Sequence, residues 1–186
     1  WQNPEQEYSE KVIETLKNYF VLASNGLLYL PKKRENEEVY DGVLIDDNFN
    51  VSLLRDLRQN RKRLVSYKEG LIARLKENDS RVRFVPFGYS VGEVSDLSKN
   101  ALAVGLAGEG GADKLNDVAK KYKEKYHLNP YIDFFSEVKT EDLRSPALDS
   151  GCVGDRLYFH GNILVDYMGG CAFGVELNAE GVSPKN

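Results

Sequence analysis

The chain has 186 residues, of which 41% are hydrophobic and 29% are charged, values that are ordinary for a globular protein of one domain or of one domain with an extension. Its net charge of -4 argues against wholesale nucleic-acid binding, and no apolar run reaches the roughly 18 residues that a membrane-spanning helix needs. No signal peptide is visible, so the cellular location stays open, with surface or extracellular display as one option.

The first part of the chain predicts a helix followed by two strands. Residues 5–23 have apolar side chains at helical spacing, and Asn25-Gly26 supplies a stop. Residues 27–30 and 39–45 are short apolar runs that are typical of strands. A charged turn separates the two runs, so they can pair as a hairpin.

Residues 53–75 are predicted to form a second helix, with Asn50 or Ser52 as its cap. Between Arg55 and Glu77 there are eight basic residues against three acidic ones. This surplus has two interpretations. It could be a patch that binds nucleic acid or another anionic surface, or a solvated helix face balanced by the acidic first fifty residues. The second interpretation is the more common one for such charge runs.

A strand and two helices are predicted next. The strand is expected at residues 82–87, and Pro86 near its end suits a sheet edge or a bulge. One helical segment is expected to begin at Ser95, and a lysine-rich second helix is expected at residues 112–126. The glycine-rich stretch between them is similar to a phosphate-binding loop. However, no Gly-Lys-Ser/Thr occurs, and Asp113 in the first turn would repel a phosphate, so we expect a tight helix–helix connection.

The part at residues 144–175 has an unusual composition. It follows a break at Asn129-Pro130 and residues 131–135, which are expected to be a strand or a buried aromatic segment. It contains six glycines and no lysine, and it interleaves aromatic and short polar residues with apolar ones in no clean period. Rigid aromatic area with adaptable polar groups is typical of antibody-like recognition surfaces. The alternative is a glycine-rich hairpin region whose aromatic side chains belong to the core.

Several short motifs carry a resemblance to a known family. They are RSPALDS at residues 144–150, Leu157, Gly161, AFGV at residues 172–175, FVPFGY at residues 84–89 and NALAVGLAGEGGADKL at residues 100–115. Together they resemble the variable proteins of diversity-generating retroelements, especially those of the archaeal branch. The resemblance covers about residues 81–175, and none is seen over the first eighty residues.

This resemblance implies both a fold and a function. The family has a C-type lectin fold of the formylglycine-generating-enzyme type, in which two helices flank the sheet. Its members bind diverse ligands through hypermutated side chains. The mutation strikes template adenines, often in AAY codons, and such codons cannot become lysine codons, which agrees with the lysine gap. We therefore expect an α+β fold with a C-type lectin-like domain at residues 81–186, a variable region at about 144–175, and a helical and hairpin extension at residues 1–80 packed on the core.

The same resemblance divides the variable region into scaffold and ligand-facing positions. The apolar framework residues are expected to be scaffold: Leu148, Leu157, Phe159, Ala172, Phe173 and Val175. The residues between them are expected to face the ligand: Gly151, Cys152, Val153, Gly154, Asp155, Tyr158, His160, Asn162, Ile163, Leu164, Asp166 and Tyr167. Strand alternation supports this division, because it places Tyr158 and His160 on the face opposite Leu157.

No catalytic residues, metal ligands or cofactors are predicted. His127 and His160 are the only histidines and are not spaced as metal ligands, and the variable region has too few carboxylates and amides for calcium. The enzymatic relative of the fold uses a reactive cysteine pair, but Cys152 and Cys171 match no motif of that site. They could form a disulfide in an oxidising compartment. The resemblance instead places Cys152 among the diversified positions, where pairing would be accidental.

Three hypotheses about function follow. The favoured one is a ligand-binding protein with a variable surface, whose unknown ligand is a protein or another surface molecule. The second is an enzyme on the same fold, which would need a nucleophile or a metal. The third is an interaction module that uses the basic helix at residues 53–77, for example on nucleic acid, although the overall charge makes nucleic acid unlikely as a partner.

Overall fold

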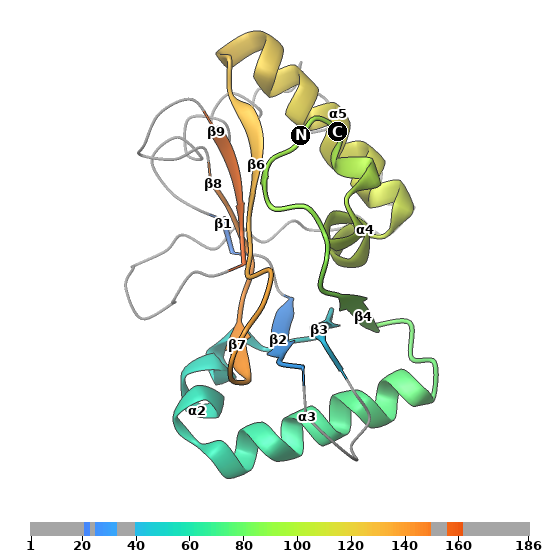
Figure 1. Ribbon diagram of the computed structural model, residues 1–186, viewed down its shortest axis with the longest axis vertical. Helices are drawn as coiled ribbons and strands as arrows, with labels where there is room; N and C mark the ends of the chain where they lie inside the picture. The colour runs from blue at the N-terminus through green and yellow to red at the C-terminus, as the bar shows by residue number, and fades with distance from the viewer. Residues whose placement is uncertain (1–20, 23–24, 33–39, 150–155, 162–186) are drawn as a thin grey trace, which may run out of the picture.

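The computed structural model describes residues 21–22, 25–32, 40–149 and 156–161 of the chain (Figure 1). These residues form two β-sheets and four α-helices, so the chain has a mixed α+β fold, as its sequence predicts. Within these ranges, the helices are all too short or too polar to cross a membrane.

A four-stranded antiparallel sheet, called sheet B, lies at the centre. Its strands are β4 (Val82–Pro86), β3 (Gly42–Asp46), β2 (Gly26–Leu30) and β7 (Asp142–Arg144), in that order. The pairing of β2 with β3 confirms the predicted hairpin, and β4 lies at a sheet edge as its proline suggests. The expected domain boundary at residue 80 stays a prediction, and the strand pairs β3–β4 and β2–β7 cross it.

Sheet B is buried on both faces, because side chains of β2 and β3 alternate between two hydrophobic cores. Leu27 and Tyr29 belong to one core, whereas Leu28 and Leu30 belong to the other. Every residue of β2 and β3 is buried. Two-sided burial explains why these strands are continuous apolar runs rather than alternating ones.

Two helices cover one face of sheet B. They are α2 (Leu54–Gln59) and α3 (Arg61–Lys76), preceded by the 3-10 turn η1 (Val51–Leu53), and Figure 1 shows them below the sheet. The single helix expected over residues 53–75 is therefore interrupted. Asn60 adopts an extended backbone, and its side chain accepts a hydrogen bond from the Arg63 N–H, so it caps α3 and ends α2.

A second helix pair lies on the other side of sheet B. After the 3-10 turn η2 (Leu97–Lys99) come α4 (Ala101–Ala107) and α5 (Glu109–Tyr126). Gly108 alone separates α4 from α5, and its φ of 72° is accessible to glycine at little cost. The predicted tight helix–helix connection is thus confirmed at Gly108, but α5 begins at Glu109 rather than at Ala112, so Gly110 and Gly111 lie within the helix.

The second sheet, called sheet A, has five strands and packs against the same core as α4 and α5. Its order is β1 (Val21–Leu22), β8 (Ala147–Asp149), β9 (Arg156–His160), β6 (Asn129–Asp133) and β5 (Gly92–Glu93). Neighbouring strands are antiparallel except β6 and β9, which are parallel.

Sheet A corrects two predictions. Val21 and Leu22, expected at the end of a helix, instead form β1, because β8 supplies partners for their backbone groups; residues 5–20 of that helix lie outside the described residues. The second correction is that β6 begins at Asn129 rather than after Pro130. The carbonyl of this proline accepts a hydrogen bond from the N–H of Val94, so the ring does not prevent pairing on that side.

The end of β9 is fixed to sheet B at Gly161. The buried hydroxyl of Tyr29 donates a hydrogen bond of 2.9 Å to the carbonyl of Gly161. The N–H of Gly161 donates to the carbonyl of Asp133 at 2.9 Å, which extends the β6–β9 pairing by one residue. A side chain at this position would overlap with the ring of Phe134, so the close approach requires glycine.

We predict that Gly161→Ala lowers the stability of the fold by roughly 1–3 kcal/mol, because the added methyl group has no space beside Phe134 and Tyr29. Thermal melting followed by circular dichroism measures the loss. Gly70→Ala is the matched control. Gly70 lies in α3 with no atom near the new methyl group, so this variant should gain helix propensity and melt no lower than the wild type. Equal melting temperatures for both variants would contradict the prediction.

Candidate functional site

Strands β6 and β9 present a row of polar and aromatic side chains on one face of sheet A, which we call the aromatic strip. The parallel register places residues of the two strands opposite one another. The strip consists of three such pairs, Asn129 with Arg156, Tyr131 with Tyr158, and Asp133 with His160. All six are intermediate in exposure rather than buried.

The opposite face of the same two strands belongs to the core. Pro130, Ile132 and Leu157 are buried, and Phe159 packs against the core cluster that contains Leu157. Leu157 and Phe159 therefore face the core while Tyr158 and His160 face away from it. This confirms the strand alternation predicted for residues 157–160.

Ring contacts join the residues of the strip. The rings of Tyr131 and Tyr158 lie 5.2 Å apart and tilted by 56°, and the ring of Tyr158 is stacked on that of His160 at 4.9 Å. The guanidinium of Arg156 lies 4.5 Å from the centre of the Tyr131 ring, in a cation–π contact. The strip is thus a continuous aromatic surface, with a guanidinium at one end.

A carboxylate and an imidazole lie at the other end of the strip. Oδ2 of Asp133 is 2.9 Å from Nδ1 of His160, and the side chains are 38% and 14% exposed respectively. This contact fixes the orientation of the imidazole ring. An Asp–His pair also occurs in catalytic triads, but the six residues of the strip include no serine or cysteine nucleophile. The arrangement is better suited to recognition, because it combines aromatic rings with a positively charged guanidinium and a negatively charged carboxylate.

The predicted ligand-facing residues are only partly visible here. Tyr158 and His160 belong to the strip. The remaining ones lie outside the described residues: Gly151, Cys152, Val153, Gly154, Asp155, Asn162, Ile163, Leu164, Asp166 and Tyr167. Among the residues that the structure does describe, no group of three His, Cys, Asp or Glu side chains is placed to hold a metal ion.

Sequence reasoning missed four members of the strip, namely Asn129, Tyr131, Asp133 and Arg156. A signal for them was present. Asn129 to Asp133 alternates polar or aromatic residues with apolar ones, which is the pattern of a half-buried strand. Arg156 stands two residues before Tyr158 and so shares its face. That β6 and β9 are neighbours could not be derived from either pattern.

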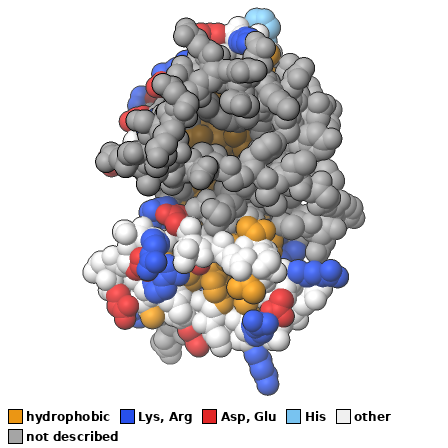
Figure 2. Space-filling model, turned by 180° about the vertical axis from the view of Figure 1, so that it is seen from behind, with side chains coloured by type: hydrophobic (Ala, Val, Ile, Leu, Met, Phe, Trp, Pro, Cys, Tyr) orange, Lys and Arg blue, Asp and Glu red, His pale blue; other side chains and the backbone are white. Residues whose placement is uncertain are grey.

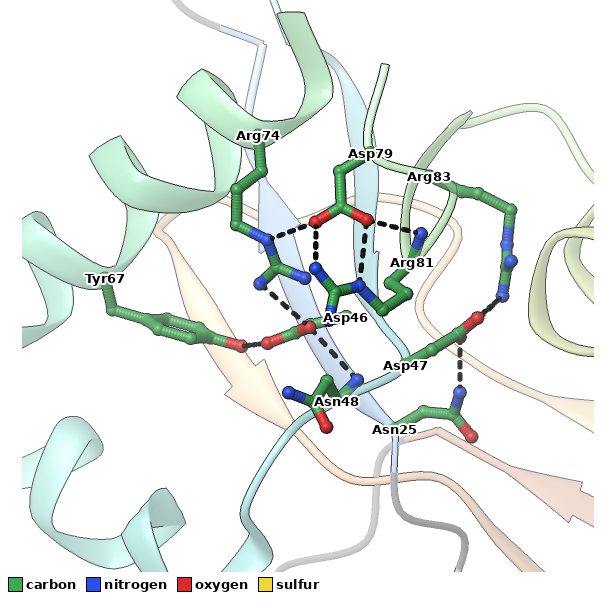
Figure 3. Close-up of polar contacts among 9 residues, drawn as sticks. All are labelled: Asn25, Asp46, Asp47, Asn48, Tyr67, Arg74, Asp79, Arg81 and Arg83. Carbon is green, nitrogen blue, oxygen red and sulfur yellow. Dashed lines mark hydrogen bonds and ion pairs between the residues drawn. The ribbon is translucent and has the colours of Figure 1, made fainter. Parts of the chain in front are cut away.

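A second polar cluster joins α3 to the ends of β3 and β4 (Figure 3). Its centre is Asp46, a residue only 3% exposed, which accepts hydrogen bonds from the Tyr67 hydroxyl at 2.9 Å and from Arg74 at 3.2 Å. Asp79 accepts from Arg74 at 2.9 Å and from Arg81 at 3.0 Å. The hydrogen bonds from Arg81 hold the pKa of the Asp79 carboxyl well below its usual range.

Asp47 extends this cluster towards α4. It pairs with Arg83 and accepts a hydrogen bond of 2.7 Å from the Asn25 amide. Arg83 also donates to the carbonyl of Gly105 in the last turn of α4, so one guanidinium links sheet B to that helix. Each carboxylate of the cluster has a cationic partner, and we interpret the cluster as structural rather than catalytic.

The basic surplus on α2 and α3 is used largely within the molecule. Five of the eight basic side chains there form ion pairs with carboxylates: Arg58, Arg61, Arg63, Lys68 and Arg74. Glu141, whose side chain is 5% exposed, pairs with two of them. In Figure 2 the described lower half of the molecule shows basic and acidic side chains interspersed rather than one basic patch. These pairs favour the interpretation of a balanced helix face over that of an anion-binding patch.

No protein-family model, curated protein or solved structure matches this chain. The geometry of the aromatic strip is therefore the main basis for a functional argument.

We predict that the two faces of β9 contribute unequally to stability. Leu157→Ala should cost about 2–5 kcal/mol, because the side chain is 1% exposed and its removal leaves a cavity. Tyr158→Ser should cost about 1 kcal/mol, since it removes partly exposed ring contacts with Tyr131 and His160. Urea denaturation of both variants measures the difference. A larger loss for the serine variant would show that the strip is part of the core.

We also predict that Asp79 makes the fold acid-sensitive. Its pKa is lower in the folded state than the ordinary value of 3.8, so its contribution to stability is complete above that value and is lost as the pH falls below it. Asp79→Asn should therefore be less stable than wild type at pH 7, and the gap should narrow as the pH falls below about 4. Denaturant titrations at several pH values measure this gap, and a gap that stays constant with pH would refute the assignment.

Proposed function

We propose that the chain is a ligand-binding protein whose region at about residues 144–175 is diversified by a retroelement, on a C-type lectin fold of the formylglycine-generating-enzyme type. The observation that carries the proposal is the aromatic strip. Its variable-region members, Arg156, Tyr158 and His160, point away from the core that Leu157 completes. Side chains in such positions can change without removing apolar burial from the core.

The framework motif of the resemblance also supports the proposal, because its residues are expected to be buried scaffold rather than exposed and variable. Its first residues are built into the fold: Ser145 is 0% exposed and Ala147 is 5% exposed. The hydroxyl of Ser145 donates to the carbonyl of Asn25, and Arg144 pairs with Asp142 and lies over the ring of Phe135. Residues that match the family motif are thus fixed to the segments before β2 and after β6, as expected of a scaffold.

The fold also agrees with the proposal in its broad features. A mixed sheet flanked by the helix pair α4 and α5 is the arrangement that the resemblance implies. The segment over residues 100–115, which resembles the archaeal variable proteins, includes α4 and the junction at Gly108. The partner remains a protein or another surface molecule, recognised by side chains rather than through a bound metal.

Sequencing of the DNA that flanks the gene tests this proposal directly. We expect a near-copy of the segment that encodes residues 144–175, differing from it mainly at adenines, and a reverse transcriptase gene close by. The substituted codons should include those of Tyr158 and His160, and should leave Leu157 and Gly161 unchanged. The codons for Ile132 and Phe134 should lie outside the copied segment, and the unchanged codons of Leu157 and Gly161 serve as the internal control. A flank without any such copy would contradict the proposal.

A further inference from the structure

We infer that the aromatic strip accepts a basic side chain of a protein partner, arginine or lysine, with Asp133 as its counter-charge and the stacked rings of His160 and Tyr158 beside it. This inference deepens the proposed function by naming the chemistry of the partner. It rests on that function only in taking the strip as the binding face. The juxtaposition that supports it is a partly exposed carboxylate next to stacked aromatic rings, at one end of two parallel strands.

The charge of Asp133 is incompletely satisfied within the described part of the chain. There its side chain pairs with His160 alone, and a histidine carries a compensating charge only when it is protonated. An ionised carboxylate has about four lone-pair positions, and one imidazole nitrogen uses one of them. With its side chain 38% exposed, Asp133 retains capacity for a donor from outside the molecule.

The rings beside Asp133 strengthen the case for a cation. Tyr158 and His160 are stacked at 4.9 Å with their planes 6° apart, so they form an ordered aromatic wall next to the carboxylate. Arginine side chains stack favourably on such rings and bind carboxylates through two parallel hydrogen bonds. The strip already shows one contact of this kind, because the guanidinium of Arg156 lies over Tyr131.

Arg156 does not neutralise the charge of Asp133. It lies at the other end of the strip, four residues before His160, which corresponds to roughly 13 Å along a strand. Its guanidinium is engaged by the Tyr131 ring and by further contacts. An anionic ligand would therefore meet an occupied arginine at one end and the Asp133 carboxylate at the other. Charge complementarity favours a basic group.

Nuclear magnetic resonance titrations of the isotope-labelled full chain test the inference with defined probes. N-acetyl-arginine amide is the probe, and N-acetyl-citrulline amide is its neutral isostere. We expect saturable shifts at Asp133 and Tyr158 with the arginine probe, and binding of the citrulline probe weaker by roughly fivefold, the range of a partly exposed ion pair. Equal binding of the two probes, or shifts confined to other parts of the chain, would overturn the inference.

Two variants locate the effect. Asp133→Asn removes the charge but keeps the backbone carbonyl that accepts from Gly161, so it should fold and should bind both probes equally weakly. Asp117→Asn is the matched control, since Asp117 is an exposed carboxylate of α5 with a side chain 71% exposed, and should leave binding unchanged. Unchanged arginine binding in Asp133→Asn would refute the assignment. If Asp133→Asn does not fold, the comparison of the two probes on the wild type decides alone.

The outcome is separable from that of the proposed function. If the flanking DNA holds a template copy but the chain shows no preference for the arginine probe, the proposed function stands and only the inference of a basic partner fails. If the chain prefers the arginine probe but the flanking DNA holds no template copy, the proposed function fails and the strip remains a cation-binding site of a protein that is not diversified.

Discussion

The hydrogen bond from the Tyr29 hydroxyl to the Gly161 carbonyl fixes the position of β9 relative to sheet B, and the aromatic strip depends on that position. Tyr29 is fully buried, and burial raises the pKa of its hydroxyl well above the ordinary value, so the group stays neutral and donates. Loss of the donor would leave the buried carbonyl unpaired, at a cost of about 1–3 kcal/mol. Because Gly161 follows His160 directly, this contact also sets the end of the strip at which Asp133 lies.

Charged residues have two separate roles in this molecule. Around Asp46 and Glu141, both nearly buried, they are matched by arginines and lysines and attach α2 and α3 to sheet B. The cost of removing such charges from water offsets much of their mutual attraction, so these buried pairs add little net stability, but loss of one partner would leave a buried charge uncompensated. On the strip the charges are fewer and more exposed, and Asp133 has a histidine rather than a permanent cation as its partner. The first set is a property of the fold, and the second is suited to an external partner.

The parts of the fold that follow from local patterns could be read from the sequence, whereas non-local pairing could not. Continuous apolar runs predicted the β2–β3 hairpin, and alternation predicted which side of β9 Leu157 occupies. The helical period of residues 5–23 did not reveal that Val21 and Leu22 pair with β8, more than a hundred residues away. Likewise, only two of the six strip residues, Tyr158 and His160, were predicted. Tyr131 and Asp133 join it because β6 lies parallel to β9, a pairing that requires a long connection and leaves no local signal.

This parallel pairing has a consequence for how a variable surface would work. Under the proposed function, substitutions fall on β9 but not on β6, so every variant would present its residues at positions 158 and 160 beside the same Tyr131 and Asp133. The fixed strand supplies ring area and a negative charge, and the variable strand supplies shape and hydrogen-bonding pattern. Rigid neighbours lower the entropy cost of ordering new side chains on binding. A partly fixed strip therefore narrows the range of ligands while it raises the fraction of variants that can bind one.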